Sequence, residues 1–172
     1  MAIRQILQLG DPILWQPCEP VLEEALAEVK DVIADLHDTL FEFRKVHGFG
    51  RAIAAPQIGV SKRIVYMFID EPVAFVNPVL DELSEEMLEL WDDCMSFPDL
   101  LVRLRRHRSC RITYRDAEWT HREQVLEGDL SELLQHECDH LDGVLAVSRA
   151  IDETSFSLRG PYGTFHRDAM DQ

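Results

Sequence analysis

Two histidines and a glutamate lie close together within a predicted helix, in the sequence HECDH at residues 136–140. Side chains four positions apart share one face of a helix, so His136 and His140 can bind the same metal ion. Glu137 is rotated from His136 by about 100 degrees, so its carboxylate can reach a water at the metal rather than the metal itself. Two imidazoles leave a tetrahedral ion short of a ligand, so the fold must bring a third donor to this helix from elsewhere.

The helix around this motif has recognisable ends. Asp129 is the expected N-cap, and Glu132 stands three residues later, where a capping box has its acid. Gly143 lies where a glycine often follows a helix C-terminus. The apolar face is supplied by Leu130, Leu133, Leu134 and Leu141.

The zinc peptidases use extended forms of the same motif, and this chain lacks the third ligand of both. One form places a histidine three residues after the glycine, but Ala146 occupies that position here. The other form takes a glutamate from a later helix; Glu153 is available, but no helix is predicted around it. Cys94 can supply the missing donor, because a thiolate is a strong ligand that loses its proton on coordination.

The rest of the sequence predicts one long helix and several strands. From Val21 to Phe41, apolar residues recur at three- and four-residue steps, which predicts an amphipathic helix ending before His47. Strands are predicted at residues 63–69, 75–80 (bent at Asn77 and Pro78), 87–91, 100–104 and 111–114, and around Val125. After residue 144 a strand or loop and then a mobile tail are expected. The order of elements predicts an α+β fold, with mixed or antiparallel strands around the central HExxH helix and with a long N-terminal helix.

Length and charge limit the functional classes. The 172 residues fit a single domain, taken as residues 1–172. The formal charge of −15 argues against nonspecific nucleic-acid binding, which depends on Lys and Arg. Neither a membrane-spanning apolar run nor a secretion signal is recognised, so the expected location is the cytoplasm, away from membranes.

Cysteines and clustered arginines have ordinary explanations outside the motif. A cytoplasmic location predicts four free thiols, of which Cys18, Cys110 and Cys138 are expected to be small buried hydrophobic residues. The arginines between residues 103 and 111 are expected to line a strand edge or to pair with nearby acids.

Three segments in fixed order resemble motifs of the peptide deformylases. Residues 50–57 read GRAIAAPQ against the family's G-x-G-x-A-A-P-Q, and residues 92–96 read DDCMS against E-G-C-x-S. Residues 135–140 read QHECDH against Q-H-E-x-D-H. Shorter matches at 7–12, 76–78 and 141–145 extend the resemblance over roughly residues 6–147. The combination is far more specific than any one motif.

The resemblance implies a role for each matched residue. Cys94, His136 and His140 would be the metal ligands, both histidines through Nε2. Glu137 would take a proton from water and later give it to the leaving amine. Gln57 and the backbone N–H of Met95 would stabilise the oxyanion, although Gln57 could instead be a turn residue bonded to backbone.

Arg106 has two possible roles. The resemblance suggests an ion pair with Asp92 that steadies the metal loop. The alternative is a solvated arginine on a strand.

The family reaction removes the formyl group from the N-terminal formyl-methionine of newly made polypeptides. The implied partners are therefore N-formylated nascent peptides, and the implied cofactor is one divalent metal ion, commonly Fe²⁺, with Zn²⁺ or Ni²⁺ in preparations. The alternatives are hydrolysis of another small N-acyl amide, or a non-catalytic metal-binding protein of the same fold. The presence of Glu137 and Gln57 argues against the latter.

Ribosome contact has little support, because the C-terminal segment lacks the basic helix with which some relatives dock.

Four positions depart from the family pattern. Ala52 replaces the second glycine of the first motif, and Arg51 replaces an apolar residue; both are expected to line the substrate groove. The Ala52 methyl group would either crowd the peptide or point into the core, in which case Arg51 or Asp93 is the better candidate for altered specificity. Asp92 and Asp93 replace Glu and Gly.

Five further histidines match no motif and are expected at surfaces or helix ends rather than as ligands. They are His37, His47, His107, His121 and His166.

Overall fold

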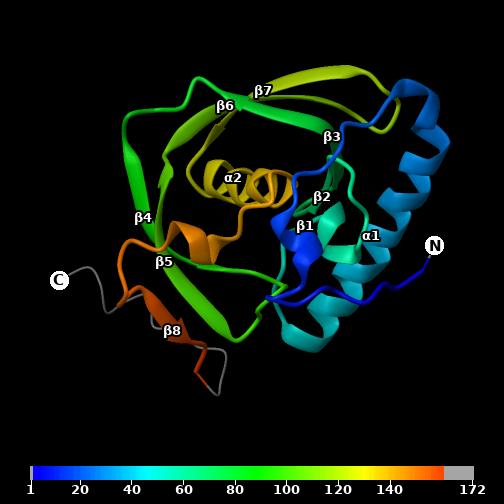
Figure 1. The fold of residues 1–172 in the computed structure, drawn as a ribbon. Coiled ribbons are helices and arrows are strands. Elements are labelled where there is room, and N and C mark those ends of the chain that lie inside the picture. The colour runs from blue at the N-terminus through cyan, green and yellow to red at the C-terminus, as the bar shows by residue number, and fades with distance from the viewer. Residues whose placement is uncertain (1, 161–172) are drawn as a thin grey trace.

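Two antiparallel sheets enclose the helix that carries the HECDH motif, and a longer helix lies outside them (Figure 1). The structure is a computed structural model and describes residues 2–160. Its elements in chain order are the 3-10 helices η1 (Pro12–Trp15) and η2 (Glu23–Ala25), helix α1 (Leu26–His47), strand β1 (Ala52–Ala54), η3 (Ala55–Ile58), β2 (Ile64–Phe68), β3 (Pro72–Asp81), β4 (Met87–Asp93), β5 (Leu100–His107), β6 (Ser109–Arg115), β7 (His121–Glu127), helix α2 (Asp129–Leu141), η4 (Ala146–Arg149) and β8 (Phe156–Leu158). The five-stranded sheet has the order β1-β2-β3-β6-β7, and the three-stranded sheet has the order β4-β5-β8. The α+β prediction is therefore confirmed.

Helix α1 ends at His47, one residue beyond the predicted end, and begins later than predicted. Gly48 terminates it in a left-handed conformation, with its N–H donating to the Arg44 carbonyl at 2.8 Å. The predicted start at Val21 is wrong, because Asn77 of β3 binds both backbone groups of Val21 through its side-chain amide, each at 2.8 Å. Val21 is thereby tied to the sheet, and the chain makes the η2 turn before the α-helix begins.

The six predicted strands are present, most of them longer than predicted. β3 bends at the predicted place, where Asn77 has a φ of 50° and the pairing with β6 shifts register between Val76 and Val79. β1 was not predicted, because three residues are too short to show an alternating pattern. The weakly patterned segment after residue 144 forms η4 and β8. The predicted mobile tail beyond residue 160 lies outside the described residues.

Helix α2 begins at Asp129, but the predicted capping box is wrong. The N-cap is Gly128, with φ 57° and ψ −123°, and no side chain caps the helix there. The reason is the short connection: β7 ends at Glu127, so the chain must reverse at one residue whose backbone angles favour glycine. The Glu132 side chain is free for a different contact, with Arg51.

The core is divided by the five-stranded sheet. Alternate side chains of a strand face opposite sides, so Ala52 and Ala54 of β1 pack towards α2, whereas Ile53 packs towards α1. A third cluster lies against the three-stranded sheet and includes Cys94. All four cysteines are free and buried, as predicted. Within residues 2–160, no helix is both long and apolar enough to cross a membrane.

Side-chain bonds hold α2 against the end of β5. Gln135 accepts from the His107 N–H at 3.0 Å and donates to the His107 carbonyl at 2.8 Å. The Ser131 hydroxyl donates to the same carbonyl at 2.9 Å. Because every residue from Ser131 to Leu141 is buried, these bonds satisfy polar groups that water cannot reach.

Gly143 allows the chain near the N-terminus to pass close to the end of α2. Its φ is +70°, and a Cβ atom built there would lie 2.8 Å from backbone atoms of Trp15 and Gln16. The Cys18 N–H donates to the Leu141 carbonyl at 2.8 Å in the same region. Backbone atoms cannot move aside as a flexible side chain can, so this position excludes a side chain.

We predict that Gly143→Ala lowers the free energy of unfolding more than Gly48→Ala does. Gly48 also has a positive φ, of +78°, but a Cβ there meets nothing within 4 Å. The control should lose about 1–2 kcal/mol for its left-handed conformation. Gly143→Ala should lose a further 1–3 kcal/mol or so from the clash. Urea unfolding of both variants measures the difference, and equal losses would contradict the close approach.

Candidate metal centre and active site

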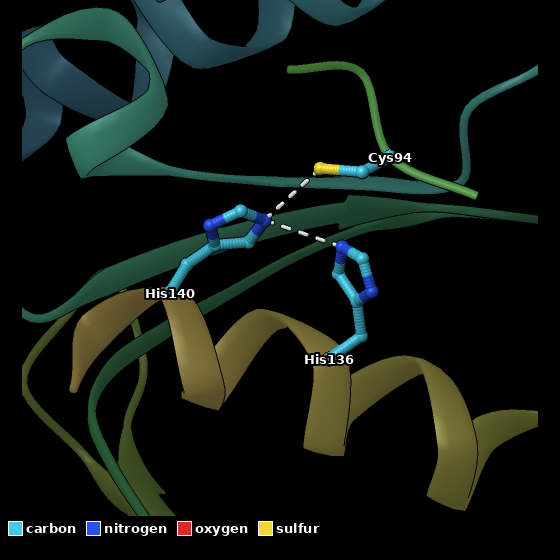
Figure 2. Close-up of side chains that lie close together, drawn as sticks. All are labelled: Cys94, His136 and His140. Atoms are coloured by element: carbon cyan, nitrogen blue, oxygen red, sulfur yellow. Dashed lines mark hydrogen bonds between the residues drawn. The ribbon is translucent and has the colours of Figure 1, made fainter. Parts of the chain in front are cut away.

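Three donor atoms from two parts of the chain meet between helix α2 and the segment that carries Cys94 (Figure 2). Cys94 directly follows β4, while His136 and His140 come from successive turns of α2. The His140 Nε2 lies 3.3 Å from the Cys94 Sγ and 3.2 Å from the His136 Nε2. All three side chains are buried, and their donor atoms lie within 4.8 Å of one another. The sequence predicted this same trio and both Nε2 atoms.

The spacing and chemistry of these donors fit a divalent metal ion. In a tetrahedral site with bonds of about 2.1 Å to nitrogen and about 2.3 Å to sulfur, neighbouring donors are about 3.4–3.6 Å apart. The two observed separations, 3.2 Å between the nitrogens and 3.3 Å between nitrogen and sulfur, are only slightly shorter. One sulfur and two imidazole nitrogens are also a donor set that such ions accept.

Asp92 orients the first of the two histidines. Its Oδ2 lies 3.0 Å from the His136 Nδ1 and also accepts from the Arg106 Nη2 at 2.9 Å. A carboxylate accepts hydrogen bonds, so Nδ1 carries the proton and the Nε2 lone pair faces Cys94 and His140. Burial would raise the pKa of Asp92, but His136 and Arg106 outweigh burial and lower it.

The two histidines have opposite pKa shifts. Burial opposes the charged form of His136, yet the neighbouring Asp92 carboxylate raises its pKa well above 6.5. His140 is equally buried, and burial together with the positive charge of His136 lowers its pKa well below 6.5. The difference arises because Asp92 binds the His136 ring, whereas the His140 Nδ1 has no hydrogen-bond partner among the described residues.

Arg106 joins the metal donors to a buried ionic network. Its side chain is 2% exposed, and its Nη1 donates to Asp139 at 2.7 Å while its Nη2 binds Asp92. Asp139 in turn pairs with Arg149 of η4. The ion pair suggested by the resemblance is confirmed, and the solvated alternative is wrong, because Arg106 shares the inner face of β5 with Leu104.

The other clustered arginines pair with nearby acids, as expected. These pairs are Arg103 with Glu89 and Asp152, Arg105 with Glu89, Arg108 with Glu86, and Arg111 with Asp81 and Glu82.

Glu137 and Gln57 face the same space as the donors. Glu137 is buried, its Oε2 has no hydrogen-bond partner among the described residues, and burial raises its pKa to about 7. The Gln57 Oε1 accepts from the Ala54 N–H at 2.9 Å. Since that N–H can only donate, the amide orientation is determined, and Nε2 points towards Cys94 Sγ (3.6 Å) and Ser96 Oγ (3.2 Å). Gln57 thus binds backbone with one end and faces the site with the other.

A cleft of about 410 Å³ opens onto this site. Its walls come from the segment around β1, the end of β4 and the N-terminal half of α2. They consist of Arg44, Gly48, Phe49, Gly50, Arg51, Ala52, Gln57, Asp92, Asp93, Cys94, Met95, Glu132, Leu133, His136 and Glu137. Both residues expected in the groove, Arg51 and Ala52, are therefore among them.

The departures from the family pattern are accommodated in different ways. Ala52 is 4% exposed and belongs to the cluster packed on α2, which favours the methyl pointing into the core. Arg51 pairs with Glu132 across the cleft. Asp93 pairs with Arg159, whose guanidinium also lies 4.0 Å from the ring centre of Phe49. Each added charge at the cleft thus has a partner of opposite sign.

Sequence reasoning missed several residues around the site. Ser96, Asp139, Arg149 and Arg159 were assigned no role, and Glu132 was assigned to a helix cap. Glu132 carried a usable signal, because it lies four residues before His136 and therefore on the same helix face. Ser96 and Asp139 carried another, because both stand within the matched motifs. Arg149 and Arg159 come close only through long-range folding.

The four unmatched histidines within residues 2–160 are not among the converging donors, as expected, but only His47 and His121 lie at a helix end or an exposed surface. Nδ1 of His37 lies 2.6 Å from the Tyr66 hydroxyl, and Nδ1 of His107 lies 2.7 Å from the Ser84 carbonyl. His47 ends α1, and His121 is exposed at the start of β7. His166 lies outside the described residues.

An α+β fold built around an HExxH helix, with a thiolate and two imidazoles converging beside a buried glutamate, defines the class of metal-dependent hydrolases. Residues 3–155 match the family model described as polypeptide deformylase. The chain belongs to the polypeptide deformylase family.

Named relatives and solved structures agree with the family model. The chain is 34% identical to a peptide deformylase of Leptospira biflexa, over 87% of this chain and 88% of that protein. It is 36% identical to peptide deformylase 1 of Prochlorococcus marinus, over 95% and 89%. The crystal structure of peptide deformylase from Thermotoga maritima superposes with a TM-score of 0.81 at 31% identity, covering 88% of this chain and all of that one.

We predict that Arg106→Met lowers the free energy of unfolding by about 3–5 kcal/mol, because it leaves two buried carboxylates without their shared cation. The neighbouring Arg105→Met is the matched control. Its pair with Glu89 is solvent-exposed, so the loss should stay below about 1 kcal/mol. Chemical unfolding of both variants tests this, and similar losses would show that the buried network adds little stability.

Proposed function

We propose that this chain hydrolyses the formyl amide of N-formyl-methionyl peptides, using a divalent metal ion held by Cys94, His136 and His140. The observation that carries the proposal is the convergence of these three donors at a cleft that also contains Glu137 and Gln57. Membership of the deformylase family supports the reaction, in which water adds to the formyl carbon, the C–N bond breaks, and formate and a free amine leave.

A divalent ion held there would supply a Lewis acid that lowers the pKa of water and polarises the formyl oxygen. Glu137 would accept the proton that this water loses and deliver it to the departing amine nitrogen. Its burial supports that role, because a pKa of about 7 lets the same carboxyl group both take and give a proton near neutral pH.

Gln57 and Met95 would stabilise the negative charge that develops on the formyl oxygen. The Gln57 Nε2 is turned to the site by the bond that Oε1 accepts from Ala54, so this donor needs no reorientation during the reaction. The Met95 side chain packs into the core beside α1, which leaves its backbone N–H as the group that can serve the cleft.

The peptide would lie along β1. Among the strands of residues 2–160, β1 is at the edge of its sheet and pairs with β2 alone, so its other edge can accept an extended chain as an added strand. Arg51 and Ala52 would be the substrate-binding residues, Ala52 through its backbone. A peptide deformylase of Acinetobacter baumannii has been solved with Met-Ala-Ser bound, with a TM-score of 0.79 at 28% identity to this chain over 86% of its length and 98% of that protein's, and it supports a peptide occupant.

Fe²⁺ is the proposed physiological ion, with Zn²⁺ or Ni²⁺ as substitutes. The thiolate and imidazole donors would accept any of the three. N-formylated nascent peptides are the proposed partners. A single catalytic domain at residues 1–172 and a cytoplasmic location remain predictions from the sequence, and contact with the ribosome is not part of the proposal.

We predict that Glu137→Gln retains the metal but loses about 10²–10⁴-fold in kcat, because it removes a proton carrier and no ligand. The assay is formate release from formyl-Met-Ala-Ser, with metal content measured on the same samples. Near-normal turnover would remove Glu137 from the mechanism.

We predict that Cys94→Ala loses metal affinity as well as activity. Cys138→Ala is the matched control: it is a buried thiol inside the same HECDH sequence but does not line the cleft. Retention of one tightly bound metal ion per chain by Cys94→Ala would contradict the proposed ligand set.

We predict that chelation abolishes formate release and that anaerobic Fe²⁺ restores it more fully than Zn²⁺ does. Folding should be monitored in parallel by circular dichroism, so that loss of structure is separated from loss of the ion. Full activity after complete metal removal would exclude the proposed mechanism.

A further inference from the structure

An ion pair forms part of the cleft wall close to the metal donors. Arg51 lies just before β1, and its Nη2 donates to the Oε1 of Glu132 in α2. The Nη1 of Arg51 also lies 3.4 Å from the Asp129 carbonyl. The Glu132 side chain is 10% exposed and that of Arg51 is 41% exposed, so the pair is partly shielded from water.

This pair lies within reach of the first side chain of a substrate whose formyl group is at the donors. The cleft is lined by Glu132, Leu133, His136 and Glu137 of α2, and not by His140. It therefore extends from the donors towards the N-terminal turn of the helix, and Glu132 is one turn from His136 on the same face. A side chain of methionine length ends about 6–8 Å from the formyl carbon, by standard bond lengths, which is enough to span one helical turn of about 5.4 Å.

Other charged side chains at the cleft already bind groups within the protein. Arg44 donates to the carbonyls of Gly50 and Phe68, and Asp93 is paired with Arg159. The Arg51–Glu132 pair differs from these, because within the described residues its hydrogen bonds use only Nη1 and Nη2 of Arg51 and Oε1 of Glu132. The Arg51 Nε–H and the Glu132 Oε2 remain for a ligand.

A thioether matches such a wall poorly. Its sulfur is a weak acceptor and has no proton to donate, so a methionine side chain would displace water from the pair and return no hydrogen bond to Glu132. A carboxamide of similar length can accept from the guanidinium and donate to the carboxylate. A ligand that takes water from the Arg51 Nε–H and the Glu132 Oε2 without replacing its hydrogen bonds binds more weakly in the transition state.

We propose that the Arg51–Glu132 pair sets the choice of the first residue, favouring a neutral polar side chain of about methionine length, such as glutamine, over methionine. The inference rests on the proposed deformylase function and concerns selectivity at the same site. Arg51 and Glu132 are specificity residues here, and the donors, Glu137 and Gln57 are unchanged.

The test compares kcat/KM for formate release from formyl-Gln-Ala-Ser, formyl-Met-Ala-Ser and formyl-norleucine-Ala-Ser by the metal-loaded protein. The wild type should prefer glutamine to both apolar residues. The double variant Arg51→Leu, Glu132→Leu replaces the pair by apolar side chains, so the ratio of glutamine to methionine should fall by about tenfold or more. The single variant Glu132→Gln keeps the side-chain size and should lower the ratio by a smaller factor.

The control is the double variant Glu89→Leu, Arg105→Leu, which removes an exposed cross-strand pair outside the cleft. Its ratio should equal that of the wild type. The inference is overturned if the wild type releases formate but prefers methionine. It is also overturned if the cleft variants leave the ratio of glutamine to methionine unchanged. Either result leaves the proposed function intact. Absence of formate release from all three substrates rejects the proposed function and this inference with it.

Discussion

The shared contact of Arg106 with Asp92 and Asp139 is the interaction on which the site depends. It joins the end of β4, the inner face of β5 and the middle of α2 through one buried guanidinium. Cys94 follows directly after β4, and His136 is bound by Asp92, so both donors take their positions from this junction. Burying three charges is costly, and the planar guanidinium limits that cost by offering each carboxylate a separate Nη donor.

A polar helix can occupy the centre of this fold because each of its faces meets a different surface. Leu133, Leu134 and Leu141 pack on the sheet. Gln135 satisfies backbone groups of His107, and Asp139 satisfies Arg106. The remaining face of the helix, with Glu132, His136 and Glu137, lines the cleft. The helix therefore contributes both to the hydrophobic core and to the cleft, and Leu133 belongs to both.

The sequence patterns predicted those features of the structure that depend on residues close together in the chain. The HECDH spacing gave the helix face, and the apolar period gave α1, because both depend on residues within a few turns. Cys94 could be placed only through the need for a third donor and the resemblance to a family. The start of α1, the strand β1 and the partner of Glu132 were missed, since each depends on a contact across the fold: Asn77 with Val21, β1 with β2, and Arg51 with Glu132.

The departures from the family motifs become intelligible when they are considered with their partners. Asp93 would place an unpaired negative charge beside the donors, but Arg159 neutralises it from the segment after β8. Arg51 would be an isolated cation in the cleft, but Glu132 lies opposite it. The hydrogen bonds of Arg51 and Arg159 go to Asp129, Glu132, Pro98 and Asp93 and not to the side chains of Cys94, His136 or His140. The three donors can therefore keep their arrangement while the charges beside them differ. The proposed metal ligands are held by buried contacts. Arg51 and Glu132, which we propose to meet the substrate side chain, bind each other at the cleft wall, so substitution there should change selectivity before it changes chemistry.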